Sequence, residues 1–84
     1  MNIIDDIKII ELYFERNEQA IKETDIKYGK FCRNMAYKIL NNHQDSEECV
    51  NTTYLEMWDR IPPTRPAKFK AYISRIVRST SVDR

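Results

Sequence analysis

The chain has 84 residues, 42% of them hydrophobic and only one of them glycine, and a formal net charge of +1. This length fits a single domain near the lower limit for folding without disulfides or metals, and the scarcity of glycine favours helices over a β-rich fold. The acidic start differs from a secretory signal and no apolar run approaches the roughly 20 residues that cross a bilayer, so we expect a cytoplasmic protein without a membrane partner.

Two helices are predicted in the first half of the chain. Over about residues 3–16, apolar side chains at helical spacing indicate an amphipathic helix, whose expected buried residues are Ile3, Ile7, Ile10 and Phe14. A long second helix is expected over residues 18–40, and it tolerates Gly29 at a cost of about 1 kcal/mol relative to alanine. Its apolar stripe consists of Ile21, Tyr28, Cys32, Met35 and Ile39.

The third helix is predicted to begin at Asp45, after a turn over residues 41–44. Asp45 is expected to cap the free N–H groups of the first turn, while Glu48 reaches back as in a capping box. Pro62 and Pro63 end this helix, because proline lacks the N–H donor and restricts the residue before it. The residues expected to face the core are Val50, Tyr54, Met57, Trp58 and Ile61.

The fourth helix is expected to begin after Pro66, since proline is well tolerated in a first helical turn. Its expected buried residues are Phe69, Tyr72, Ile73, Ile76 and Val77. Four helices with short connections predict an all-α fold. We expect a compact bundle with a long second helix and a proline-rich loop before the last one.

Charge is distributed unevenly along the chain. Residues 1–59 carry seven Lys and Arg against twelve Asp and Glu, a net charge of −5. Residues 60–84 carry seven Lys and Arg against one acidic residue, a net charge of +6. This polarity indicates two kinds of partner, a protein for the acidic part and a nucleic acid for the basic part.

One face of the third helix combines an apolar side chain with polar neighbours. At 100° per residue, the side chains that project away from the core stripe are Glu48, Asn51, Thr52, Leu55 and Asp59. Single exposed leucines are ordinary, so this face is either plain surface or a docking face with Leu55 as its anchor.

The fourth helix has a basic face beside Tyr72. The residues that share this face are Lys68, Ala71, Arg75, Arg78 and Ser79, and the preceding loop adds Arg60 and Arg65. Lysine and arginine side chains bind phosphates. An aromatic ring that stacks on an unpaired base contributes about 1–3 kcal/mol to the binding free energy. A loop held rigid by prolines would shape a pocket for an extruded base. The alternative is a basic face that is only solvated.

Little in the sequence indicates catalysis or metal binding. His43 is the single histidine and lies in a polar turn, and no glycine-rich phosphate loop is present. Cys32, His43 and Cys49 would supply three zinc ligands, but the spacing typical of zinc sites and a fourth ligand are missing. We therefore expect two reduced core thiols and no enzyme.

The ordered residues of the second half of the chain resemble a known family. The segments that carry the resemblance are Asp45–Pro66, DSEECVNTTYLEMWDRIPPTRP, and Ala71–Arg78, AYISRIVR. They resemble region 2 of bacterial sigma factors of the sigma-70 family, with the extracytoplasmic-function type as the closest. The resemblance covers roughly residues 8–84. Complete members also carry region 4, which binds the −35 element and is absent from this sequence, so we expect residues 1–84 to be one region 2-like domain.

The resemblance implies a transcription initiation module of bacterial RNA polymerase that requires no cofactor or metal. The residues implied in docking on the clamp helices of the largest polymerase subunit are Glu48, Asn51, Thr52 and Leu55. The loop and fourth helix would bind the −10 promoter element as a melted non-template single strand. The residues implied in this DNA binding are Arg60, Pro63, Thr64, Arg65, Lys68, Tyr72, Arg75, Arg78 and Ser79. An anti-sigma factor is a further candidate partner.

Three positions depart from the family pattern. Thr52 stands where an acidic residue is common, and Ser79 and Thr80 stand where asparagine and leucine are common. These departures leave open a second function, a helical protein–protein interaction module on the same scaffold that does not read DNA. A helix-turn-helix reader of duplex DNA is disfavoured, because no short glycine-bearing turn precedes the basic helix.

Overall fold

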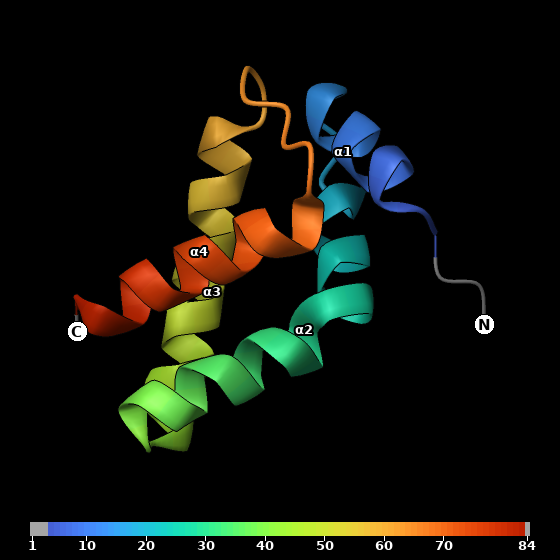
Figure 1. The fold of residues 1–84 in the computed structure, drawn as a ribbon. Coiled ribbons are helices and arrows are strands. Elements are labelled where there is room, and N and C mark those ends of the chain that lie inside the picture. The colour runs from blue at the N-terminus through green and yellow to red at the C-terminus, as the bar shows by residue number, and fades with distance from the viewer. Residues whose placement is uncertain (1–3, 84) are drawn as a thin grey trace.

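A computed structural model describes residues 4–83, and within them the chain forms four α-helices and no strand. The helices are α1 (Asp6–Phe14), α2 (Gln19–Leu40), α3 (His43–Arg60) and α4 (Phe69–Val82). They form a bundle of 34 × 29 × 20 Å, in which α2 packs against each of the other three helices. The predicted all-α bundle, with its long second helix and its proline-rich loop before α4, is confirmed (Figure 1).

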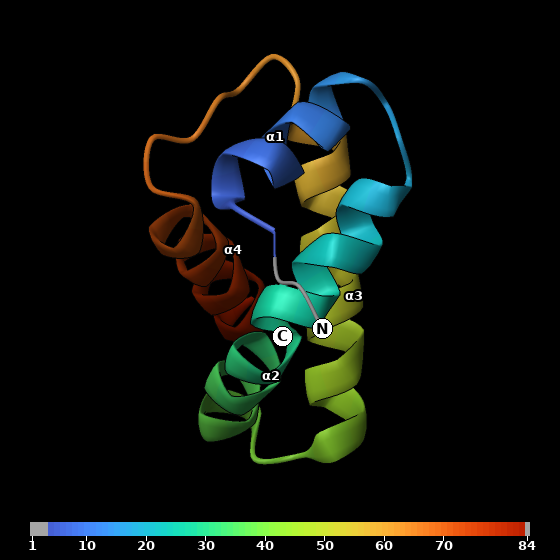
Figure 2. The ribbon, with the colours of Figure 1, turned by 90° about the vertical axis from the view of Figure 1, so that its right-hand side faces the viewer.

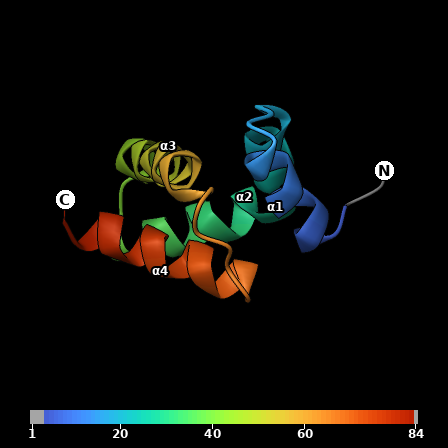
Figure 3. The ribbon, with the colours of Figure 1, turned by 90° about the horizontal axis from the view of Figure 1, so that it is seen from above.

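The two ends of the molecule are formed by different elements. Figure 2 shows the loop over residues 61–68 arching from the end of α3, past α1, to the start of α4. Seen from above, α1 lies beside the first part of α2 at one end of the molecule, and the last turn of α4 lies at the opposite end (Figure 3). The loop and α1 are therefore neighbours although about 50 residues separate them in the sequence.

The core draws side chains from every helix. Ile9 of α1, Cys32 of α2, Met57 of α3 and Ile73 of α4 are all completely buried. The apolar surface removed from water by such side chains is the main stabilising contribution to a bundle of this size, at about 25 cal/mol per Å². The helix α1 is consequently part of the core rather than an appendage.

The predicted buried face of α1 was partly wrong. Ile10 is buried as expected and Phe14 is half-buried, but Ile7 is 66% exposed. Ile9 and Tyr13 are completely buried in its place, and Ile3 lies outside the described residues. The error has a physical cause: the Tyr13 hydroxyl forms a hydrogen bond to the buried Thr24 Oγ1 at 2.8 Å, which allows a polar-tipped ring to enter the core.

The apolar stripe of α2 was predicted correctly in its middle and incorrectly at its end. Tyr28 and Cys32 are buried, whereas Ile39 is 41% exposed. Small side chains at Ala20 and Ala36 are completely buried and were missed, because they carry a weak hydrophobic signal. A Cβ atom at Gly29 would collide with Asp25 Oδ1.

The start of α3 also differs from the prediction. The helix begins at His43, and the Asn42 side chain accepts the hydrogen bond from Asp45 N at 2.8 Å. Asn42 is thus the N-cap, and Asp45 occupies the third helical position rather than the cap. The turn is reduced to Asn41 and Asn42, where Asn41 adopts the left-handed conformation with φ 53°. The predicted capping box at Asp45 and Glu48 was wrong.

The end of α3, the start of α4 and the core faces of both helices agree with the sequence interpretation. Proline residues follow the last residue of α3, and the buried side chains of the two helices include Val50, Tyr54, Met57, Ile61, Phe69, Ile73, Ile76 and Val77. Trp58 and Tyr72 were expected in the core and are half-buried at its edge. Both lie beside the proline-rich loop, and this position matters for the site described next.

Candidate functional site

The first candidate surface is the α3 face, formed by Glu48, Asn51, Thr52 and Leu55. All four side chains are exposed, and Leu55 is exposed by 62%. The opposite side of α3 fixes this orientation, because Cys49, Thr53 and Met57 are completely buried there.

A contact between helices also holds α3 in this orientation. The Sγ atom of Cys49 lies 3.0 Å from Ser81 Oγ of α4. The exposed apolar side chain of Leu55 is therefore held outward by the packing of the core.

A groove of about 450 Å³ between α2 and α3 borders the α3 face at Asn51. Within it, Asp25 Oδ1 accepts hydrogen bonds from Tyr54 Oη at 2.8 Å and from Arg33 Nη1 at 3.1 Å. Arg33 Nε also lies 3.6 Å from Glu47 Oε1. Burial raises the pKa of the Tyr54 hydroxyl, and its hydrogen bond to Asp25 raises it further. Sequence reasoning missed this network, since Asp25 and Arg33 lie on α2 whereas Tyr54 and Glu47 lie on α3.

The end of α3 is held by Arg16, which lies in the turn between α1 and α2. The Arg16 Nη1 atom donates to the carbonyl oxygens of Trp58, at 2.7 Å, and Ile61, at 3.0 Å. Its guanidinium group also lies 3.8 Å from the centroid of the Trp58 ring. A cation at a helix C-terminus satisfies free carbonyl groups and interacts favourably with the helix dipole. Arg16 therefore fixes the point at which the loop leaves α3.

The loop itself is held at two more places. The backbone N–H of Thr64 donates to the Arg60 carbonyl at 2.9 Å, which forms a turn directly after α3. The Arg65 guanidinium lies 4.3 Å from the centroid of the Phe14 ring of α1, a cation–π contact. Arg60 pairs with Glu56 at 3.6 Å on the exposed surface of α3. Two of the predicted DNA-binding cations are thus already engaged with neighbours in the protein.

A pocket of about 340 Å³ lies where the loop meets α4. The lining residues are Pro66, Ala67, Lys68, Ala71, Tyr72 and Arg75. The Tyr72 hydroxyl is buried and lacks a hydrogen-bond partner among residues 4–83. Burial raises the pKa of Tyr72, while the nearby Arg60 and Arg75 charges act in the opposite direction. We call this the Tyr72 pocket. Its lining combines apolar side chains, the Tyr72 ring and the cations Lys68 and Arg75.

The nine residues implied in DNA binding do not all gather at one place. Lys68, Tyr72 and Arg75 line the Tyr72 pocket. Pro63 and Thr64 are exposed on the loop, and Ser79 is exposed on α4. Arg78 lies at a different edge of α4, where it lines a hollow together with Lys38 of α2. Pro66, Ala67 and Ala71 complete the pocket without having been chosen as site residues, because small apolar side chains give no distinctive signal.

The cysteine thiols and the histidine lie apart from these surfaces. Cys32 and Cys49 are free and buried, and burial raises the pKa of the Cys32 thiol to about 12. The exposed His43 stacks on Tyr37, with ring centroids 4.5 Å apart. Among residues 4–83, no three His, Cys, Asp or Glu side chains are grouped so that they would hold a metal ion. Within the same range, no helix has the length and apolar character that a membrane span needs.

Comparison with known proteins gave a match at the level of a family. The family model described as Sigma-70 region 2 matches residues 26–84. This range includes most of α2 and all of α3, the loop and α4, and thus every residue of the α3 face and of the Tyr72 pocket. No curated protein and no solved structure matches the chain significantly.

Proposed function

Because this chain belongs to the Sigma-70 region 2 family, whose members act in transcription initiation, we propose that it is region 2 of an extracytoplasmic-function sigma factor. Its two candidate surfaces suit two partners at once. The α3 face would dock on the clamp helices of the largest subunit of core RNA polymerase. The loop and α4 would bind the −10 promoter element as a melted non-template single strand.

The exposure of Leu55 supports polymerase docking through the α3 face. Leu55 is 62% exposed, and polar residues at Glu48, Asn51 and Thr52 surround it. An apolar anchor inside a polar rim is the usual composition of a protein interface. Thr52 contributes a hydroxyl where many relatives of the proposed type have a carboxylate, so this contact relies more on Leu55.

The Tyr72 pocket supports the binding of single-stranded DNA, and its unpartnered hydroxyl is the observation that carries the proposal. A buried hydroxyl without a partner costs about 1–3 kcal/mol, and a polar edge of an extruded base would supply the missing hydrogen bond. Lys68 and Arg75 at the pocket would hold the flanking phosphates. Arg60, Pro63, Thr64 and Arg65 would border the strand along the loop, and Arg78 and Ser79 would contact it further along α4.

The polymerase contact is tested with Leu55→Asp. We expect this variant to lose at least ten-fold in affinity for core RNA polymerase in a pull-down or fluorescence anisotropy titration, because a charge replaces the apolar anchor. The matched control is Ile7→Asp, which places the same charge on α1 at a side chain that is 66% exposed. Equal polymerase binding by wild type and Leu55→Asp, with unchanged circular dichroism, would refute docking through the α3 face.

The DNA contact is tested with Arg75→Ala and a fluorescent single-stranded oligonucleotide that carries a −10-like sequence. We expect weaker binding and a salt dependence reduced by about 0.7 in slope, because one phosphate contact is removed. Lys8→Ala, which removes an exposed cation from α1, is the control. If neither Arg75→Ala nor Arg78→Ala changes the affinity while polymerase binding persists, the chain is a protein interaction module that does not read DNA.

A further inference from the structure

A further hollowed surface runs between α2 and α4 and meets the Tyr72 pocket at Lys68 and Ala71. Two hollows of about 540 and 440 Å³ share Phe31 of α2 as a lining residue. We call this surface the α2–α4 groove and define it by Phe31, Met35, Lys38, Ile39, Lys70 and Arg78. None of them belongs to the α3 face or lines the Tyr72 pocket.

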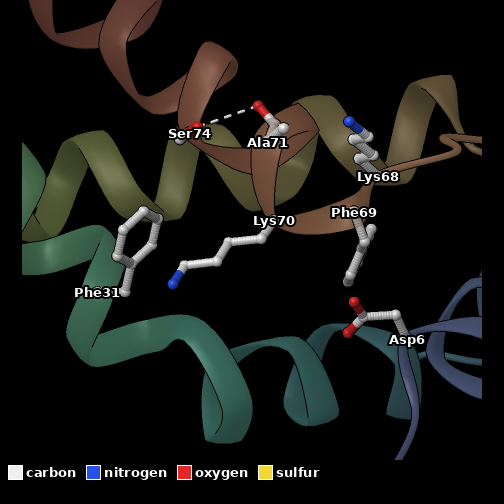
Figure 4. Close-up of a pocket in the computed structure, with 7 residues that line it drawn as sticks. All are labelled: Asp6, Phe31, Lys68, Phe69, Lys70, Ala71 and Ser74. Carbon is white, nitrogen blue, oxygen red and sulfur yellow. Dashed lines mark hydrogen bonds between the residues drawn. The ribbon is translucent and has the colours of Figure 1, made fainter.

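The floor of the α2–α4 groove is apolar. Phe31 and Met35 are half-buried against the core, and Ile39 is 41% exposed. These residues follow one another at steps of four along α2, so they form a stripe of about 12 Å on a single helix face. Figure 4 shows one end of the groove, where Lys70 extends from α4 toward Phe31. The Lys70 Nζ atom lies 4.6 Å from the centroid of the Phe31 ring.

Cations flank this floor on both sides. Lys38 stands on α2, and Lys70 and Arg78 stand on α4, with all three side chains exposed. None of them forms an ion pair with another of residues 4–83. Asp6 lines this end of the groove, and its Oδ1 atom already accepts hydrogen bonds from Lys27 and Tyr28. The groove therefore offers an apolar stripe between positive charges that have no acidic partner.

We propose that the α2–α4 groove binds an acidic amphipathic α-helix of a protein partner. Apolar side chains of that helix, spaced three or four residues apart, would pack on Phe31, Met35 and Ile39. Carboxylates beside the apolar stripe would pair with Lys38, Lys70 and Arg78, and this charge complementarity would set the orientation of the helix.

A single nucleic-acid strand fits this groove less well than an acidic helix. Binding of a strand depends on open aromatic faces on which bases stack. Phe31 is the aromatic ring among the six defining residues, and Lys70 already lies over it. Met35 and Ile39 are aliphatic and suit leucine or isoleucine side chains of a protein. Arg78 is shared with the proposed promoter contact, whereas the other five residues that define the groove are not.

The experiment uses a displayed library of 15-residue helical peptides with leucine fixed along one stripe and Glu, Lys, Gln or Ala varied beside it. The library is selected on the wild-type protein and counter-selected on Ile39→Asp. We expect glutamate to be enriched over lysine beside the leucine stripe. Lys38→Glu combined with Arg78→Glu should lower the affinity of a selected peptide at least ten-fold. The same peptide with its glutamates changed to lysine should bind this charge-reversed variant again.

Leu55→Asp is the matched control and should bind the selected peptide like wild type. The proposal is overturned if the selection enriches no peptide, or enriches lysine over glutamate beside the leucine stripe. It is also overturned if Ile39→Asp retains the selected peptides as well as wild type does. An oligo(dT) titration followed by NMR tests whether a single nucleic-acid strand binds in the groove instead. If the oligonucleotide shifts the amide signals of Phe31, Met35 and Ile39 while selected peptides do not, the groove is a nucleic-acid site and the proposal fails. Circular dichroism checks that each variant remains folded.

Discussion

The Tyr72 hydroxyl stands out at the scale of single residues. Of the buried side-chain oxygen and nitrogen atoms in residues 4–83, it is the one without a hydrogen-bond partner. Most buried polar groups in proteins are satisfied, so such an exception often has a functional reason. Tyr72 lines the pocket between the loop and α4. The domain therefore carries a local instability at the place where we propose that DNA binds.

This interpretation predicts opposite effects of Tyr72→Phe on stability and on binding. We expect the free energy of unfolding to rise by about 1–3 kcal/mol, because the unsatisfied hydroxyl is removed while the ring remains. Affinity for the −10-like oligonucleotide should fall. Urea denaturation and fluorescence anisotropy measure the two quantities, and Tyr37→Phe, at a side chain that is 38% exposed, is the control. A loss of stability in Tyr72→Phe would contradict the proposal that the hydroxyl lacks a partner.

Arg16 is a second single residue, and its contact with the end of α3 cannot be recognised from the sequence. Its backbone has φ 56°, a conformation that few residues other than glycine adopt, and its side chain bonds to carbonyls more than 40 residues away. No local pattern connects Arg16 to Trp58 or Ile61. The contact arises only because the fold brings the α1–α2 turn to the end of α3.

At the scale of elements, the start of α3 depends on one amide side chain. Asn42 accepts a hydrogen bond from Asp45 N at 2.8 Å, and its backbone carbonyl accepts from Ser46 N at 3.0 Å. The Ser46 hydroxyl donates to the same carbonyl at 2.7 Å. The contact from Asp45 N satisfies one of the N–H groups that the first helical turn leaves free.

We therefore expect Asn42→Ala to lower the free energy of unfolding by about 1 kcal/mol, the usual effect of removing an N-cap side chain. Asp45→Ala is the matched comparison. It removes a carboxylate from the first turn, where the interaction with the helix dipole is worth about 0.3–1 kcal/mol, but leaves the Asn42 side chain in place. Urea denaturation of both variants gives the result. A larger effect of Asp45→Ala than of Asn42→Ala would support a cap at Asp45, as the sequence alone suggested.

The elements themselves were largely predictable from the sequence, whereas the sites between them were not. Periodicity placed α2 nearly to its observed ends, and Pro62, Pro63 and Pro66 marked the loop between α3 and α4. Helical geometry also separated Leu55 from the buried stripe of α3, because rotation about a helix follows directly from residue spacing. The Tyr72 pocket and the Asp25 network join residues from different elements, so their geometry depends on tertiary packing that periodicity does not encode.

At the scale of the whole molecule, Tyr13 links α1 to the core through a buried relay of hydroxyl groups. The Thr24 hydroxyl donates to the Ala20 carbonyl at 2.8 Å, so Thr24 Oγ1 accepts the hydrogen bond from Tyr13. The Tyr13 ring also packs against Phe69 of α4, with centroids 6.3 Å apart. Burial raises the pKa of Tyr13 from the ordinary value of about 10 to about 12.

This raised pKa makes the stability of the molecule sensitive to alkaline pH. The folded protein keeps Tyr13 protonated more strongly than the unfolded chain does. The resulting stabilisation is complete below about pH 10 and is lost as pH rises through about 12. At pH 8, Tyr13→Phe should cost about 1 kcal/mol through the lost hydrogen bond. Between about pH 10 and 12, wild type should lose this advantage. Urea denaturation across this range measures the difference, and a constant difference would contradict the prediction.

The packing of α1 has a practical consequence for where the domain can be cut. The family match begins at residue 26, yet Tyr13 covers Phe69, Phe14 contacts Arg65, and Arg16 holds the end of α3. An expression fragment trimmed to the matched boundary would remove all three supports and expose apolar surface next to the proline-rich loop. The smallest autonomous folding unit in this sequence therefore includes the first helix, and recombinant fragments of this chain should start before Asp6.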